Sequence, residues 1–190
     1  PFVLLARSLR PLVLIRFGPM GQTGRIGNFA PDTELYLCER DLRTGLPRRL
    51  DLFYYQNRPY NHQLRKMADR KLNVFGFVRW LDMVNRALTG GEKHLIRNEL
   101  DDFQRHQLLA NTPVHLAFTE AEERWGSRAL RQLGIPPEAS FFCFIARDSA
   151  YLKSEYPGGN WSYHDYRNSS IHSYIPAVEE LVRRGYFAVR

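Results

Sequence analysis

The sequence contains little cysteine, and its cysteines do not form a pattern that would build a metal-bound or disulfide-stapled domain. Only Cys38 and Cys143 occur in 190 residues. They have neither the paired spacing of a zinc motif nor the density typical of a small secreted domain. We therefore expect both to be reduced core residues, Cys38 in a helix and Cys143 in a buried strand.

Long apolar runs are also absent. The opening stretch PFVLLARSLRPLVLIRF is interrupted by Arg7, Arg10 and Arg16, so it falls short of the roughly 20 apolar residues that a membrane span needs. It also lacks the small-residue cleavage site that ends a signal peptide. We predict a cytoplasmic protein, with a peripheral association with a membrane left open.

Lysine is scarce although the chain is basic. Lysine and arginine together number 27 and the net charge is +7, but the lysines are only Lys66, Lys71, Lys93 and Lys153. The arginines are interspersed with Asp and Glu and do not form the basic stripe or tail that nucleic-acid binding requires. We expect no nucleic acid partner.

The patterns that are present alternate between strand-like and helix-like. Short apolar runs predict strands at 11–17, 48–56, 141–148 and 186–190. Helical spacing and capping signals predict helices at 31–42, 61–72, 74–88, 118–134 and 171–185. The fold class is therefore α/β with parallel strands, and the last strand, helix and strand predict a right-handed βαβ unit.

A proline turn at 135–140 predicts the boundary between two domains. We assign 1–135 to a first α/β domain and 136–190 to the start of a second. The last residues, YFAVR, are a predicted strand, so we expect a fragment of a longer protein that is inactive alone.

A glycine-rich loop follows the first predicted strand. Residues 18–28 read GPMGQTGRIGN, with Gly18, Gly21, Gly24 and Gly27 at intervals of three. This spacing differs from the GxGxxG of dinucleotide-binding loops and from the phosphate loop of nucleotide hydrolases. Glycine permits left-handed backbone and close approach by another molecule, so the loop is either a ligand site or a tight packing turn.

A second loop follows the predicted strand at 141–148. Arg147 and Asp148 stand at its carboxyl end, where charges are costly unless they meet a ligand or each other. Aromatic and hydrogen-bonding side chains follow: Tyr151, Lys153, Tyr156, Trp161, Tyr163, His164, Tyr166 and Arg167. Such a segment is either a binding surface for a base or sugar or a loop packed by its own aromatics.

Several of these stretches resemble a known family. RFGPMGQTGRIGNFAPDTELYLCERD, NRPYNHQLRKM, HLAFTEAEE, FIARDSAYL and above all HDYRNSSIHSYIPAVEELVRRGYFAVR are similar to a family of bacterial glycosyltransferases with the two-domain GT-B architecture, over essentially the whole chain. GRIGN is also similar to the GRxGN loop of fucosyltransferases of that architecture. The resemblance implies a Rossmann-type acceptor domain followed by the first βαβ of a nucleotide-sugar domain.

The same resemblance implies site residues. In those enzymes an arginine of a His-x-Arg motif meets the donor diphosphate, and Arg147 stands in that place with Ile145 where the histidine would be. We expect the donor phosphates to be bound by Gly24, Arg25, Gly27, Asn28, Arg147, Asp148, Tyr151, His164 and Arg167. The candidate bases are Asp32 and Glu34, whose alternative role is to complement a helix start. The pair His164 and Asp165 is a second candidate.

The expected activity is transfer of a sugar from a nucleotide-diphosphate sugar to a glycan acceptor in bacterial surface polysaccharide assembly. Such enzymes use no bound metal, and the chain has no Asp-x-Asp motif, so we expect neither a metal nor a further cofactor. The alternative is a non-catalytic carbohydrate- or nucleotide-binding module on the same fold, which the isoleucine in place of histidine favours.

Overall fold

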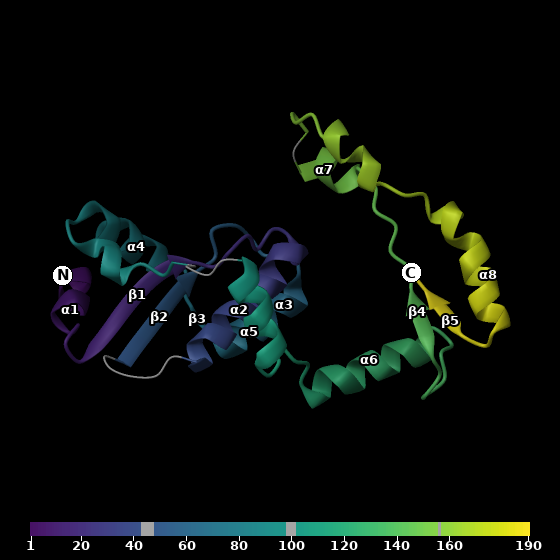
Figure 1. The fold of residues 1–190 in the computed structure, drawn as a ribbon, viewed down its shortest axis with the longest axis horizontal. Coiled ribbons are helices and arrows are strands. Elements are labelled where there is room, and N and C mark those ends of the chain that lie inside the picture. Colours follow the sequence, from purple (N-terminus) through teal and green to yellow (C-terminus); the bar gives the residue numbers. More distant parts are fainter. Residues whose placement is uncertain (43–47, 98–101, 156) are drawn as a thin grey trace. The chain divides into compact units, whose positions relative to one another are not determined.

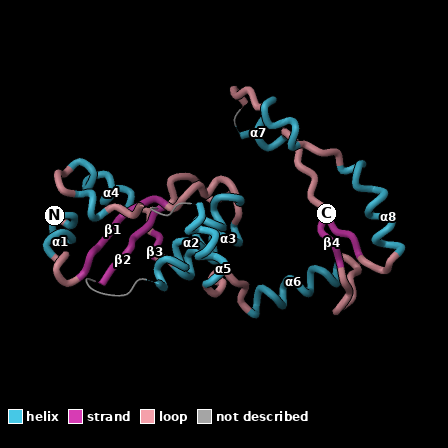
Figure 2. The backbone as a smooth tube through the Cα atoms, in the orientation of Figure 1, coloured by secondary structure: helices cyan, strands magenta, loops and turns pink. Residues whose placement is uncertain are grey.

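The computed structural model describes residues 1–42, 48–97, 102–155 and 157–190, so Tyr156 lies outside it. The fold is mixed α/β with small parallel sheets (Figures 1 and 2). The chain forms two compact units, Pro1–Phe118 and Thr119–Arg190, and each is described by itself. This division comes ahead of the expected boundary at 135/136, and the domain assignment stays a prediction.

The first unit is built around a parallel sheet with strand order β1-β2-β3. Its elements are α1 (Phe2–Ser8), β1 (Val13–Pro19), α2 (Ile26–Leu42), β2 (Arg48–Tyr54), α3 (His62–Lys71), β3 (Asn73–Val74), α4 (Val78–Ala87), the 3-10 turn η1 (Gly91–His94) and α5 (Asp102–Asn111). The predicted strands at 11–17 and 48–56 and the predicted helix at 61–72 are confirmed as β1, β2 and α3.

Helices pack on both faces of this sheet because successive strand residues point to opposite sides. Phe53 faces α2 and α3 and packs with Phe29 and Leu37. The next residue, Tyr54, faces the other way and packs with Phe17 and with residues of α1 and α4. Figure 1 shows α1 and α4 on one side of β1 and β2 and α2 and α3 on the other.

After α4 the chain crosses to the free edge of β1. Leu95 forms an isolated parallel bridge with Phe17, and the Ile96 amide donates to the Phe17 carbonyl at 2.9 Å. The connection from β1 through α2 leads to β2, which pairs with the other edge of β1. The two connections therefore leave β1 toward opposite sides of the sheet, although the paired segments stay parallel. In open α/β sheets such a switch point, at the carboxyl ends of the strands, is where ligands bind.

The predicted start of the first long helix at Pro31 is wrong. α2 begins at Ile26 and holds Pro31 in its interior. Phe29 is 1% exposed in the core, and its amide already donates to the Arg25 carbonyl at 2.9 Å. Burial of this ring fixes the helical turn that precedes the proline, which outweighs the start signal that Pro31 provides.

Weak periodicity hid other elements. β3 has two residues, too few for a pattern, and it replaces the start of the helix expected at 74–88, which begins instead at Val78. That helix ends at Ala87, and Gly90 adopts φ +78° as the cap of η1 rather than closing α4. α5 lies in a polar stretch for which we predicted no element.

The second unit contains α6 (Glu120–Gln132), β4 (Phe141–Cys143), α7 (Ala150–Glu155), η2 (Ser162–Arg167), η3 (Ile171–Tyr174), α8 (Ile175–Arg183) and β5 (Phe187–Val189). β4 and β5 pair in parallel with α8 between them, which confirms the predicted strand, helix and strand. The capping box of α6 is also confirmed: the Glu122 amide donates to Thr119 and the Thr119 amide donates to Glu122.

Two expectations for this unit are wrong. The strand predicted at 141–148 is short and exposed, and Cys143 is exposed whereas Cys38 is buried in α2. Among the described residues β4 pairs only with β5, and all three of its residues are exposed. The long loop expected at 151–168 contains α7 and η2.

Helices in the part of the chain that the structure describes lack either the length or the apolar character needed to cross a lipid bilayer.

Candidate active site at the carboxyl end of β1

The glycine-rich segment joins β1 to α2. Gly18 lies in β1, residues 20–25 form the connecting turn, and Gly27 and Asn28 lie in the first turn of α2. None of the four glycines has a positive φ; among the described residues that conformation occurs at Gly90, Gly134 and Gly185 and at one non-glycine residue, Glu138. Left-handed backbone therefore does not explain these glycines. The remaining reason is that another group approaches the backbone closely, where a side chain would be in the way.

The four glycines divide into two pairs by what surrounds them. A Cβ on Gly18 would lie 2.7 Å from Ile96 Cβ, and one on Gly21 would lie 2.5 Å from Asp32 Oδ2. A Cβ on Gly24 would meet the Tyr60 ring at an ordinary 3.6 Å, and one on Gly27 would meet nothing within 4 Å. Internal packing therefore explains Gly18 and Gly21, a Cβ on Gly24 would be tolerated beside Tyr60, and Gly27 leaves open space for another molecule.

A cavity of about 170 Å³ opens beside this segment. Its walls come from the end of β1, from α2, from β2 and from the segment that crosses to the free edge of β1. They are formed by Pro19, Met20, Gly21, Asp32, Thr33, Tyr36, Glu39, Phe53, Leu72, Ile96 and Arg97. The cavity thus lies at the switch point of the sheet, where α/β proteins bind their ligands.

Asp32 is the predicted site residue that reaches this cavity. It lies in the second turn of α2 rather than at a helix start, with its carboxylate against Gly21. Among the described residues it forms no hydrogen bond. Burial raises the pKa of the Asp32 carboxyl above its ordinary value, and the positive charge of Arg105 opposes part of this effect.

Glu34, the other candidate base, has a different environment. Its Oε1 accepts from the His115 amide at 2.6 Å, and its Oε2 accepts from the Leu116 amide at 2.9 Å. Glu34 is not among the residues that line the cavity. It holds the segment after α5 against α2, so Asp32 is the better placed of the two for chemistry.

Arg25 and Asn28 flank the open backbone at Gly27. The Asn28 side chain donates to Gln22 Oε1 at 3.3 Å and closes the turn on itself, while the Arg25 side chain is exposed. The Asn28 and Phe29 amides both donate to the Arg25 carbonyl, at 3.1 and 2.9 Å. Among the described residues, the amides of Ile26 and Gly27 are therefore those of the first turn of α2 left for a ligand. This arrangement can bind an anion, with Arg25 as a counter-charge.

Sequence reasoning missed much of the cavity wall. Tyr36 and Glu39 follow Asp32 at intervals of four and seven, which is one face of a helix, and the predicted helix at 31–42 already contained this signal. Arg97 and Arg105 come from segments without a clear pattern, and only the tertiary structure brings them to this region.

In the second unit, Arg147 and Asp148 follow β4 but do not directly end it. Arg147 is partly buried, and its carbonyl accepts from the Ser169 amide at 2.9 Å. Asp148 Oδ1 accepts from the Ala150 amide at 3.0 Å at the start of α7. The Ser169 contact brings the region of Arg167 back beside Arg147, so two of the predicted donor residues lie in adjoining backbone.

The aromatics of the second loop pack partly on one another. His164 stacks with Trp161 at a centroid distance of 6.4 Å and touches the Tyr163 ring at 4.0 Å. Tyr166 and Tyr151 are exposed, with Tyr166 at 85%. The self-packed interpretation therefore fits Trp161, Tyr163 and His164, while Tyr151 and Arg167 are exposed.

No family model, curated protein or solved structure matches the chain.

A pair of substitutions tests the division of the glycines. Gly18→Ala should lower the free energy of unfolding by about 1–3 kcal/mol, because the new methyl group overlaps Ile96. Gly27→Ala should leave it unchanged or raise it by up to about 1 kcal/mol, because alanine favours a helix. Urea denaturation of both variants measures the free energy of unfolding. An equal loss of stability in the two variants would contradict the conclusion that Gly18 has a packing role and Gly27 has none.

Proposed function

We propose that the protein is a nucleotide-sugar-dependent glycosyltransferase of GT-B architecture that acts on a glycan acceptor in bacterial surface polysaccharide assembly. The observation that carries the proposal is the cavity at the switch point of the first unit, bounded by a glycine-rich turn in which the space beside Gly27 is open. The resemblance of the sequence to such enzymes supports the same conclusion.

In the proposed mechanism the first unit holds the acceptor and contributes the base. Asp32 accepts the proton of the acceptor hydroxyl as that oxygen attacks the anomeric carbon, and the bond to the nucleoside diphosphate breaks. Arg25 and the first turn of α2 offset the negative charge that develops on the leaving phosphate. For the second unit, taken by itself, we propose that Arg147 and Arg167 bind the diphosphate of a nucleotide.

A second function remains supported by a specific observation. Ile145, which occupies the place of the family's histidine, is 83% exposed, and an isoleucine cannot donate a hydrogen bond or transfer a proton. A module that binds a nucleotide or a carbohydrate without turnover would tolerate this residue. Detection of sugar transfer by the protein would exclude this alternative.

Calorimetric titration with GDP, UDP and CDP tests the proposed donor site. We expect one nucleotide to bind, and Arg147→Ala to weaken its affinity roughly ten- to hundredfold, as for a lost charge-assisted hydrogen bond. Arg131→Ala, which removes an exposed arginine of the same unit, should leave the affinity unchanged. Binding of none of the three, or equal affinity in the Arg147 variant, would contradict the assignment.

The same titration tests the glycine-rich turn. Gly27→Ala should weaken nucleotide binding without destabilising the protein, because its methyl group occupies space that only a ligand would need. Unchanged affinity in this variant would reduce the turn to a structural connection.

A further inference from the structure

A cluster of metal-ligand side chains lies on a second face of α2. Glu34 and Cys38 are one helical turn apart, and His115 reaches them from the extended segment 112–118 that follows α5. Glu34 and Cys38 are each offset by two residues from Asp32 and Tyr36, which corresponds to a rotation of roughly 200° about the helix axis. The cluster is therefore on the side of α2 opposite the cavity residues and is independent of the proposed function.

The three ligand atoms are spaced for a small cation. Glu34 Oε1 lies 2.8 Å from His115 Nδ1, Cys38 Sγ lies 3.8 Å from that nitrogen, and Sγ lies 4.0 Å from Oε1. The centre of a triangle with these sides is about 2 Å from each corner, close to the Zn–N and Zn–O distances of about 2.0–2.2 Å and the Zn–S distance of about 2.3 Å. A zinc ion thus fits between the three atoms once it replaces the hydrogen bond between Nδ1 and Oε1 and both groups turn toward it.

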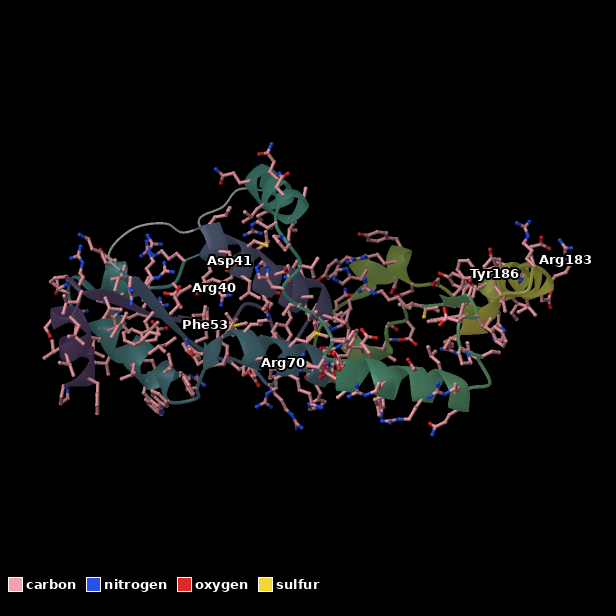
Figure 3. All side chains as sticks on the ribbon, turned by 90° about the horizontal axis from the view of Figure 1, so that it is seen from below. Arg40, Asp41, Phe53, Arg70, Arg183 and Tyr186 are labelled. Carbon is pink, nitrogen blue, oxygen red and sulfur yellow. The ribbon has the colours of Figure 1, made fainter. Side chains whose placement is uncertain are left out.

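The surroundings of His115 also suit a metal ligand. Its second nitrogen, Nε2, lies 2.8 Å from Asp41 Oδ2. Histidines that bind zinc through one nitrogen commonly donate from the other to a carboxylate, which fixes the ring. Asp41 and its neighbour Arg40 lie at the C-terminal end of α2 (Figure 3).

Hydrogen bonds also connect these side chains without a metal. Glu34, His115 and Asp41 form a chain of hydrogen bonds. Cys38 is 1% exposed, and its Sγ lies within hydrogen-bonding distance for sulfur of both Oε1 and Nδ1, so the three ligand atoms converge on one point. The Glu34 and His115 side chains are 14% and 10% exposed, so an ion there would be largely removed from bulk water.

We propose that Glu34, Cys38 and His115 bind one zinc ion, with Asp41 as the positioning residue for His115. Binding requires the Cys38 thiolate and an unprotonated Nδ1, so the displaced protons pass to solvent. The bound ion fastens the segment 112–118, which ends the first unit, to α2. Zinc would then stabilise the folded first unit by mass action.

Cobalt(II) provides the direct test, because its spectrum reports both thiolate ligation and coordination number. The protein is reduced, stripped with a chelator, freed of the chelator and titrated with cobalt(II), followed by competition with zinc. We expect saturation at one cobalt per chain, a thiolate-to-cobalt charge-transfer band, visible bands of four-coordinate intensity, and loss of both on adding zinc.

Variants identify the ligands. Cys38→Ser should abolish the charge-transfer band, whereas Cys143→Ser, the matched change at the exposed cysteine of the second unit, should leave it intact. Asp41→Asn should weaken zinc affinity roughly ten- to hundredfold while the band persists at saturation. Metal-free thermal melts of the wild type and Cys38→Ser check that the variant folds.

Three outcomes would overturn the proposal. They are the absence of stoichiometric cobalt in the wild type, a charge-transfer band that survives Cys38→Ser, and a band lost in Cys143→Ser. The first would leave the cluster as a hydrogen-bonded link between α2 and the segment 112–118.

Discussion

Replacing Asp51 by asparagine should lower the free energy of unfolding of the first unit by about 3–5 kcal/mol. Asp51 in β2 lies directly opposite Arg16 in β1. The two side chains pair through both carboxylate oxygens at 2.7 and 2.5 Å and are 4% and 10% exposed. Asparagine cannot balance the guanidinium charge, which would then be buried with only the weaker influence of Glu39 to offset it.

The cost should come mainly from the unpaired charge rather than from loss of a strongly stabilising contact. The double variant Arg16→Met, Asp51→Leu should therefore be more stable than Asp51→Asn, because it removes both charges. Tyr36, whose hydroxyl donates to Asp51 Oδ2 at 2.6 Å, would lose its acceptor in the double variant, so full recovery is not expected.

Urea denaturation measures these changes, and hydrogen exchange of the β1 and β2 amides assigns them to the first unit. Glu180→Gln provides the comparison, because Glu180 pairs with Arg183 and Arg184 at the exposed surface of α8, where such pairs contribute little. A loss below about 1 kcal/mol for Asp51→Asn would mean that water reaches Arg16 once its partner is gone.

Signals confined to a few neighbouring residues predicted their elements well. The Asn61 side chain caps α3 by accepting from the Leu64 amide at 2.8 Å, and Thr119 with Glu122 starts α6. The apolar runs of β1 and β2 also correctly predicted parallel strands. Each signal acts within one turn or one strand, so its outcome depends little on the rest of the fold.

Features that depend on distant contacts could not be predicted in this way. The start of α2 is set by burial of Phe29 against residues from other elements, and the bond between Glu34 and His115 joins positions 81 residues apart. The roles of Gly18 and Gly21 depend on Ile96 and Asp32. The glycine spacing alone therefore could not separate packing from binding.

The proposed base makes the largest functional prediction. In the proposed glycosyltransferase, Asp32→Asn should lower kcat about 10²–10⁴-fold while nucleotide affinity stays that of the wild type, since the amide keeps the size of the side chain but cannot accept the hydroxyl proton. Glu39→Gln, the matched change about two turns further along the same face of α2 and in the same cavity, should reduce turnover much less. Both turnover rates are measured as release of the nucleoside diphosphate from sugar donors that carry the nucleotide identified by the titrations.

Stability separates a catalytic role of Asp32 from a structural one. The carboxylate is partly removed from water and forms no hydrogen bond with the described residues, so its neutral isostere should leave the free energy of unfolding unchanged or raise it slightly. A large loss of stability would instead mean that Asp32 holds the turn at Gly21 in place. Loss of nucleotide affinity with turnover would assign the carboxylate to the donor site, and unchanged turnover would transfer the role of base to another group in the cavity, with Glu39 the first to examine.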